Sequence, residues 1–200
     1  MSKCIITISR EFCSGGRDIA KKLADQLGIP YYDKEIITMA AKQSGLSEEA
    51  IRQSEKRRTG SLLYSLYSMS QELPLGDQVY LIQSKVIREL AETGPCVIVG
   101  RCGDYVLRDD PNCLRVFIHA PLAYRMNYIR AYAADERDSV LENIIAKEDR
   151  NRAGYYNYYT QNRWGDASNF HVSLDASIGE DVCVEILKAA ARAFEEREGI

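Results

Sequence analysis

Arginines beside glycines, placed where apolar runs end, are the residues of this chain best able to do chemistry. The stretch IITISREFCSGGRDIAKKLA begins at residue 5 and passes from an apolar run through a Gly-Gly pair into a helical pattern. Glycines let a backbone approach a ligand closely, and the free N–H groups at a helix start attract anions. We therefore interpret this turn as a phosphate site formed by Ser9, Arg10, Ser14, Gly15, Gly16, Arg17 and Asp18. The alternative is an ordinary turn between a strand and a helix.

The turn departs from the usual phosphate-loop pattern GxxxxGK[ST]. That pattern would require Gly at position 10, Lys at 16 and Ser or Thr at 17, whereas the chain carries Arg10, Gly16 and Arg17. Of the fixed positions only Gly15 is met. A cation in the first helical turn is poorly placed against the helix dipole, so Arg17 favours a bound anion there.

Two further runs end in charged residues. Asp33 follows YY at residues 31–32, where it is either a helix N-cap or a carboxylate near bound phosphates that holds a metal water or a nucleotide hydroxyl. In VIVGRCGDYVL, Arg101 stands between two glycines just past a strand, as a phosphate contact or a solvated surface residue. The guanidinium fork matches phosphate oxygens, and Asp104 could orient it or contact a base.

The segment KEDRNRAGYYNYYTQNRWGDASNF, residues 147–170, is the richest in arginines and aromatic residues. It is interpreted as a lid that closes over phosphates and brings Arg150 and Arg152 to the transferring group. The alternative is a helix end whose aromatics pack on the core. Upstream, Arg125 could face the site, whereas Arg130 is interpreted as a solvated partner of nearby acids.

The elements that must position these residues alternate along the chain. Continuous apolar runs rich in β-branched residues predict buried parallel strands at 5–9, 29–32, 96–99, 114–119 and 172–174. Helical patterns cover 18–27, 34–43, 47–58, 78–92, 122–134, 139–151 and 180–197. This alternation predicts an α/β fold with a parallel sheet covered on both faces, whose ligands bind at the carboxyl ends of the strands.

Composition excludes several classes of protein. The 200 residues are 46% hydrophobic and 28% charged, which is typical of a globular domain, and a net charge of −3 predicts no attraction to nucleic acid or membranes. Six cysteines without CxxC or metal-like spacing indicate a reducing compartment, and no run approaches a membrane span, so we expect a cytoplasmic protein. Residues 61–69 (SLLYSLYSM) could form a homodimer surface or a packed helix face.

Three blocks give the sequence a resemblance to the cytidylate kinase-like family of P-loop proteins. These are ITISREFCSGGRDIAKKLADQLGIPYYDKEII, VIVGRCGDYVLRDDPNCLRVFIHAP and KEDRNRAGYYNYYTQNRWGDASNFHVSLDAS. The resemblance implies a three-layer P-loop fold in one domain over 1–200, with a five-stranded parallel sheet flanked by helices. It further implies an acceptor-binding helical region at 34–93 and an arginine lid at 147–169.

The resemblance also implies roles for individual residues. Residues 9–18 would hold the donor phosphates, the acceptor would be bound by Asp33, Arg101 and Asp104, and catalysis would rest on Arg17, Arg101, Arg150 and Arg152. Established cytidylate kinases carry Lys, a small residue, and Thr or Ser at the positions of Gly16, Arg17 and Asp18. The related loops of this subfamily usually carry Gly at the position of Cys13. We hypothesise that Arg17 replaces the lysine charge, and that Asp18, with Asp33 nearby, holds the Mg²⁺ of ATP.

The first hypothesis is an ATP- and Mg²⁺-dependent kinase that phosphorylates a nucleoside monophosphate, CMP or dCMP being the leading acceptor. The missing lysine supports a second, a regulatory module of the same fold that binds nucleotide or phosphate with little turnover. A third is a kinase for another small phosphorylated metabolite. Small-molecule nucleotides are the expected partners in each case.

Overall fold

A parallel sheet forms the centre of the computed structural model, which describes residues 4–56 and 73–197. Its five strands run in the order β2-β3-β1-β4-β5, and all four pairings are parallel. The strands are β1 (Ile5–Arg10), β2 (Tyr31–Tyr32), β3 (Val97–Val99), β4 (Cys113–His119) and β5 (Val172–Asp175). Because all strands point the same way, their carboxyl ends share one edge of the sheet.

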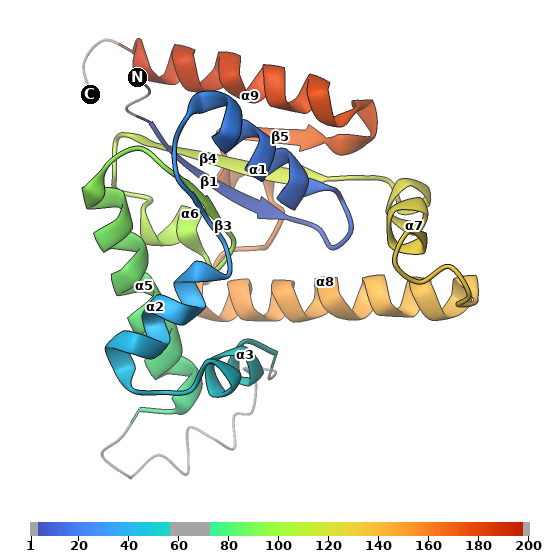
Figure 1. Ribbon diagram of the computed structural model, residues 1–200, viewed down its shortest axis with the longest axis horizontal. Coiled ribbons are helices and arrows are strands. Elements are labelled where there is room, and N and C mark those ends of the chain that lie inside the picture. The colour runs from blue at the N-terminus through green and yellow to red at the C-terminus, as the bar shows by residue number, and fades with distance from the viewer. Residues whose placement is uncertain (1–3, 57–72, 198–200) are drawn as a thin grey trace.

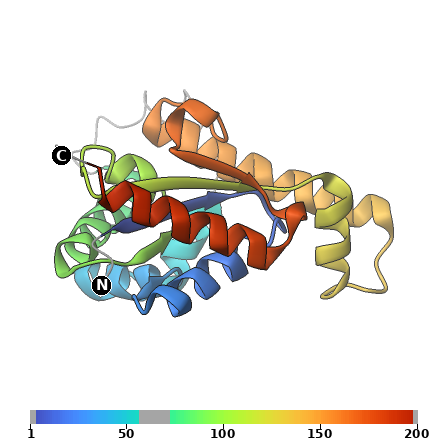
Figure 2. The same ribbon diagram turned by 90° about the horizontal axis from the view of Figure 1, so that it is seen from above.

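Two helices cover one face of the sheet, α1 (Gly16–Leu27) and α9 (Glu180–Glu195). They lie side by side, in blue and red, in the view from above (Figure 2). Their apolar stripes, which include Ile19, Leu23 and Leu187, pack on Ile6, Val116 and other strand residues in one buried cluster. The alternating burial of strand residues on two faces is what makes these runs continuously apolar.

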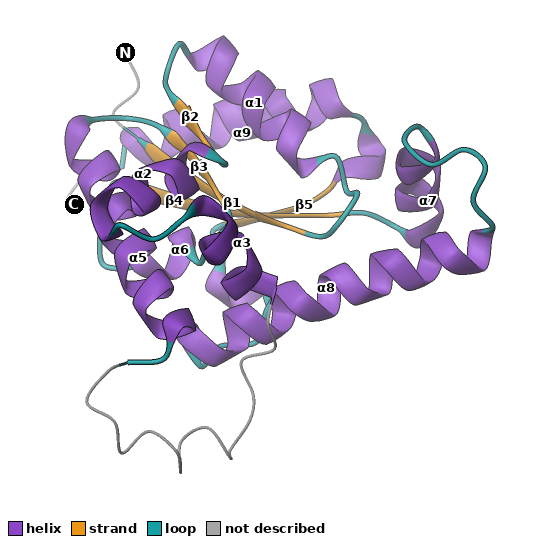
Figure 3. Ribbon diagram, turned by 60° about the horizontal axis from the view of Figure 1, so that its bottom comes forward, coloured by secondary structure: helices purple, strands orange, loops and turns teal. Residues whose placement is uncertain are grey.

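The other face is covered by α2 (Glu35–Ser44), α3 (Glu48–Lys56), α5 (Leu75–Thr93) and α6 (Gly103–Val106). A second buried cluster joins α2, α3, α5 and α6 to the sheet through residues such as Ile36, Ile51, Ile87 and Ile98. Figure 3 shows α2, α3 and α5 grouped together beside the sheet. The expected surface at 61–69 lies outside the described residues.

The last two helices are α7 (Leu122–Arg130) and α8 (Asp138–Thr160), followed by short turns at Ala167–Asn169 and Ala176–Ile178. Helix α8 runs along the sheet on the side opposite α1 and α9 (Figure 1). It continues nine residues beyond the predicted end at residue 151, so the first part of the segment expected to be a lid is regular helix. Leu141 and Ile145 pack against Met126 and Ile129 of α7.

The predicted fold is confirmed in strand number, strand direction and the covering of both faces. Strand bounds differ from the prediction by one or two residues, as expected for pattern-based assignment. Within the described part of the chain, no helix is both long and apolar enough to cross a membrane.

Candidate functional site

A cavity of about 330 Å³ lies at the carboxyl ends of β1, β2 and β3, between the α2–α3 region and α8. Its volume is in the range of small-ligand sites. Its cationic lining residues are Arg10, Arg17, Lys34, Arg52, Arg101 and Arg152. The carboxylates that face them are Asp33, Glu55 and Glu148. Cations therefore outnumber anions two to one, which favours an anionic ligand.

Asp33 forms ion pairs with two arginines of this cavity. Its Oδ2 lies 2.7 Å from Nε of Arg17, and its Oδ1 lies 3.4 Å from Nη1 of Arg101. Arg101 is 10% exposed and also donates from Nε to Oε1 of Glu55 at 2.9 Å, while Gln83 donates to the same oxygen. Helix α2 begins at Glu35 with Lys34 as its N-cap, so the N-cap interpretation of Asp33 is wrong. Asp33 instead orders two guanidinium groups.

The backbone at Arg101 is strained. Gly100, Arg101 and Cys102 have φ values of 77°, 53° and 55°, so three consecutive residues occupy the left-handed region. For residues with a side chain this conformation costs about 1–2 kcal/mol and persists only where the surroundings impose it. The turn directs the Arg101 side chain back over the strand end, where it also reaches the carbonyl of Val99.

Arg10 and Arg152 form the opposite wall. Nη1 of Arg152 donates to the backbone carbonyl of Arg10 at 2.9 Å, which fixes α8 to the end of β1. Within residues 4–56 and 73–197, the guanidinium of Arg10 has no acceptor and no ion-pair partner. Burial, and then the neighbouring Arg152, lowers the pKa of Arg10 to about 9. A bound anion would favour the charged form and reverse this shift.

A second connection ties α8 to the β1–α1 turn. Oδ1 of Asp149 accepts from the backbone N–H of Phe12 at 2.8 Å, and its Oδ2 accepts from Arg125 at 2.6 Å. Arg125 also pairs with Glu11 at 3.3 Å, and Glu11 accepts from the N–H of Ala120. Arg125 is thus buried in a structural ion cluster and does not line the cavity.

The β1–α1 turn itself has the open amides expected of an anion-binding loop. The N–H groups of Cys13, Gly15 and Arg17 have no acceptor among the described residues. However, residues 11–16 of the turn do not line the cavity, and α7 lies close to them. A Cβ at Gly15 would be 3.5 Å from the Tyr124 hydroxyl, and Tyr128 donates a hydrogen bond to Asp18.

Below the cavity, Asp104 is buried and accepts from Ser9 at 3.1 Å and from the Tyr156 hydroxyl at 2.7 Å. Burial raises the pKa of Asp104. The side chain therefore joins β1, α6 and α8. Asp104 does not line the cavity and does not contact Arg101. The expectation that it orients Arg101 or contacts a nucleotide base is therefore not supported by a contact in the structure.

The structure brings together the predicted site residues Ser9, Arg10, Arg17, Asp33, Arg101 and Arg152. It leaves Ser14, Gly15, Gly16, Asp18, Asp104 and Arg150 outside the cavity lining. Arg150 is exposed on α8, two residues from Arg152 and therefore on another side of the helix. Arg130 pairs with Asp138, as expected of a solvated partner.

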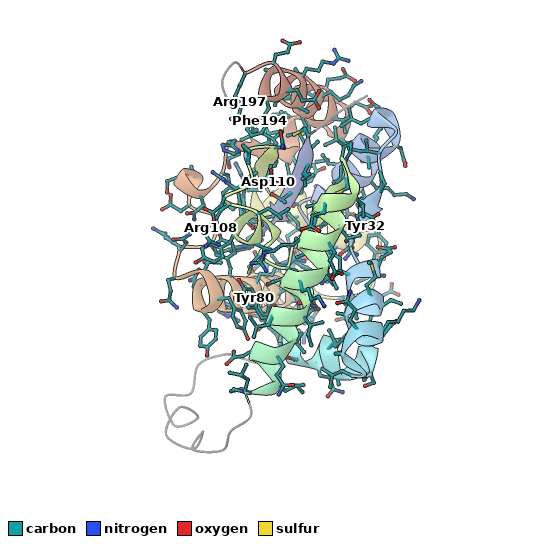
Figure 4. The ribbon with its side chains drawn as sticks, turned by 90° about the vertical axis from the view of Figure 1, so that its left-hand side faces the viewer. Tyr32, Tyr80, Arg108, Asp110, Phe194 and Arg197 are labelled. Atoms are coloured by element: carbon teal, nitrogen blue, oxygen red, sulfur yellow. The ribbon has the colours of Figure 1, made fainter. Side chains whose placement is uncertain are left out.

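Sequence reasoning missed Arg52 and Glu55 of α3, and Tyr155 and Tyr156 as single residues of the lining. The i,i+3 spacing of Arg52 and Glu55 on one predicted helix was an available signal. Tyr155 is placed by α5, because its hydroxyl contacts Gln83. The stacking of Tyr80 on Tyr159, with ring centroids 4.1 Å apart, packs α5 against α8, and Figure 4 shows Tyr80 beside α8.

The donor chemistry does not provide a ready magnesium site. Both oxygens of Asp33 are engaged by guanidinium groups, and one oxygen of Asp18 accepts from Tyr128. Among the described residues, no group of three or more His, Cys, Asp or Glu side chains could hold a metal ion. Asp33 thus does not fit the expected role of metal ligand in this arrangement.

Comparison with solved structures identifies the fold. An uncharacterized protein from Eubacterium ventriosum is 25% identical, with a TM-score of 0.73 over 97% of this chain and 99% of that chain. Shikimate kinase from Bacteroides thetaiotaomicron is 13% identical, with a TM-score of 0.55 and coverage of 94% and 98%. A gluconokinase from Sinorhizobium meliloti is 13% identical, with a TM-score of 0.55 and 98% coverage of both chains. The fold is that of the P-loop kinases.

The sequence narrows this class. Residues 5–178 match the model of the cytidylate kinase-like family, and the chain belongs to that family. A search of curated proteins finds no match.

Proposed function

We propose that the protein transfers the γ-phosphoryl group of ATP to a nucleoside monophosphate, with CMP or dCMP as the leading acceptor. Membership of a kinase-like family supports the reaction class. The observation that carries the proposal is the cationic cavity at the strand ends, where the Arg10 guanidinium has no hydrogen-bond acceptor or ion-pair partner among the described residues. Phosphoryl transfer depends mainly on positioning and on neutralising charge, which are the two things such a cavity provides.

Two arginines of the cavity have different proposed roles. Arg101 is the proposed ligand of the acceptor phosphate, because Asp33 and Glu55 hold its Nη1 and Nε while its Nη2 has no acceptor among the described residues. Arg152 on α8 is the proposed stabiliser of the charge that develops in transfer. A second hollow of about 480 Å³ at the ends of β4 and β5 shares Trp164 with the first, which leaves room for two substrates. Magnesium would enter as part of the MgATP substrate, bound mainly by its phosphates.

A binding module of the same fold is the second candidate. It is favoured by Gly16 at the position of the lysine and by the Tyr124 hydroxyl close to Gly15. Such a module would hold nucleotide or phosphate in the arginine cavity without turnover. A kinase for another small phosphorylated metabolite is a third candidate, and the same cavity would serve it.

An ADP-release assay separates these candidates. It combines ATP, Mg²⁺ and a panel of nucleoside monophosphates and phosphorylated metabolites, with the variant Arg101→Ala and the matched control Arg88→Ala. Arg88 is an exposed arginine of α5 outside the cavity lining. Turnover with CMP that Arg101→Ala lowers and Arg88→Ala leaves unchanged supports the first proposal. Nucleotide binding without turnover on any acceptor supports the module and contradicts the kinase.

A further inference from the structure

Two positions of the β1–α1 turn carry exchanged residue types. The phosphate-loop pattern has Gly at position 10 and Lys at 16, whereas this chain has Arg10 and Gly16. The structure places the two residues in contact. A Cβ at Gly16 would lie 2.8 Å from Cβ and 3.2 Å from Cγ of Arg10. A lysine at 16 would therefore force the Arg10 stem or the backbone to shift, so the two substitutions compensate sterically.

The guanidinium of Arg10 lies in the cationic cavity, at the carboxyl end of β3. It lines the cavity beside Gly100, where a Cβ would lie only 2.3 Å from its Nη1. The left-handed φ of 77° at Gly100 and its missing side chain leave room for this group at the end of β3. Arg152 anchors the Arg10 backbone while leaving the side chain without an acceptor among the described residues.

Arg17 is a weaker candidate for the same task. Its Nε is 2.7 Å from Oδ2 of Asp33, and its side chain is 51% exposed. Its charge is thus largely compensated by a carboxylate and screened by solvent. The expectation that Arg17 replaces the lysine charge is therefore less well supported by the geometry than a role for Arg10.

We propose that Arg10 supplies, from the end of β1, the cation that the usual loop supplies from its lysine, and that it binds oxygens of the nucleotide phosphates. The inference rests on the proposed function only in taking the ligand to be a phosphate chain. A guanidinium offers two parallel N–H donors to neighbouring oxygens, whereas an ammonium acts as a point charge. With a pKa of about 9 even without an anion, Arg10 is protonated at neutral pH.

The test restores the residues of the usual pattern, glycine at position 10 and lysine at position 16, singly and together. Binding of inorganic pyrophosphate and of ADP with Mg²⁺ is measured by calorimetry for the wild type, Arg10→Gly, Gly16→Lys and the double variant. Losing one charge-assisted contact should weaken binding about 10- to 100-fold in Arg10→Gly. Gly16→Lys alone should also bind weakly, because its side chain meets the Arg10 stem. In the double variant, with only Ile118 Cβ left at 3.2 Å, affinity should return to within about tenfold of the wild type.

Control variants distinguish the loss of the Arg10 charge from a loss of folding. Arg10→Met preserves the stem and should lose affinity without unfolding, Arg10→Lys should keep part of it, and Arg88→Ala should bind as the wild type does. Thermal unfolding checks that each variant is folded. Unchanged affinity in folded Arg10→Gly and Arg10→Met, a double variant no better than Arg10→Gly, or a wild type that binds neither probe would each overturn the inference. A wild type that binds both probes but transfers nothing would refute the kinase while leaving this test intact.

Discussion

Replacing Asp149 with Ala should destabilise the fold and loosen the β1–α1 turn together. Asp149 accepts from Phe12 N–H at 2.8 Å and from Arg125 at 2.6 Å, and the carboxylate and guanidinium side chains are only 17% and 10% exposed. Among the described residues, Nε of Arg125 is already buried without an acceptor. Among the described residues, the variant leaves the Arg125 guanidinium paired only with Glu11, whose Oε2 lies 3.3 Å from Nη1 of Arg125. Because one ion pair survives, we expect a loss of about 2–4 kcal/mol.

For a chain of this length the loss corresponds to a decrease in Tm of roughly 5–15 °C. The assay is urea unfolding followed by circular dichroism, with calorimetric Tm as a second measurement. Asp138→Ala is the matched control, since it removes an exposed aspartate of the same helix that pairs with Arg130, and it should cost at most about 1 kcal/mol. An Asp149→Ala protein that melts within about 2 °C of the wild type would refute the reasoning, because the buried cluster would then contribute nothing.

Three smaller predictions concern single residues. Gly100→Ala should weaken pyrophosphate binding because its Cβ would displace the Arg10 guanidinium, whereas Gly45→Ala, with a similar φ of 74° and open space, should lose only stability; calorimetry separates them. Burial raises the pKa of Asp104, so its contribution to stability is present below the unfolded pKa and is lost as pH rises through the folded pKa. Asp104→Asn should therefore gain stability relative to the wild type as pH rises above the unfolded pKa of an aspartate, about 4, and a urea-unfolding pH series that shows no relative gain would contradict this. Burial raises the pKa of the Cys13 thiol to about 11, so its alkylation at neutral pH, followed by mass spectrometry, should be slower than that of a free cysteine peptide.

The strands of this fold were predictable because each is buried on both faces. Residues such as Ile6 and Val97 pack under α1 and α9, while their neighbours Ile5 and Ile98 pack under α2 and α5, so the runs are apolar throughout. The end of α8 at Thr160 was not predicted, because the last turns of this helix do not carry their apolar residues on one face. Tyr155 contacts α5 and Tyr156 turns inward to Asp104, so both of these tyrosines, on different sides of the helix, find partners.

The arginines of the cavity other than Arg52 could be picked out by type, but not by partner. The sequence gives no sign that Asp33 would pair with both Arg17 and Arg101, since β2, α1 and the β3 turn meet only in the folded chain. For the same reason it could not tell Arg152, which faces the cavity, from Arg150, which does not. That distinction depends on the rotation of α8 about its axis.

Transfer of label from [γ-³²P]ATP, with the products resolved by chromatography, tests the central claim most directly. With CMP or another nucleoside monophosphate present, the account predicts label in the corresponding nucleoside diphosphate, strongly reduced in Arg101→Ala. Label that stays in ATP, or appears only as inorganic phosphate with every acceptor, would contradict it.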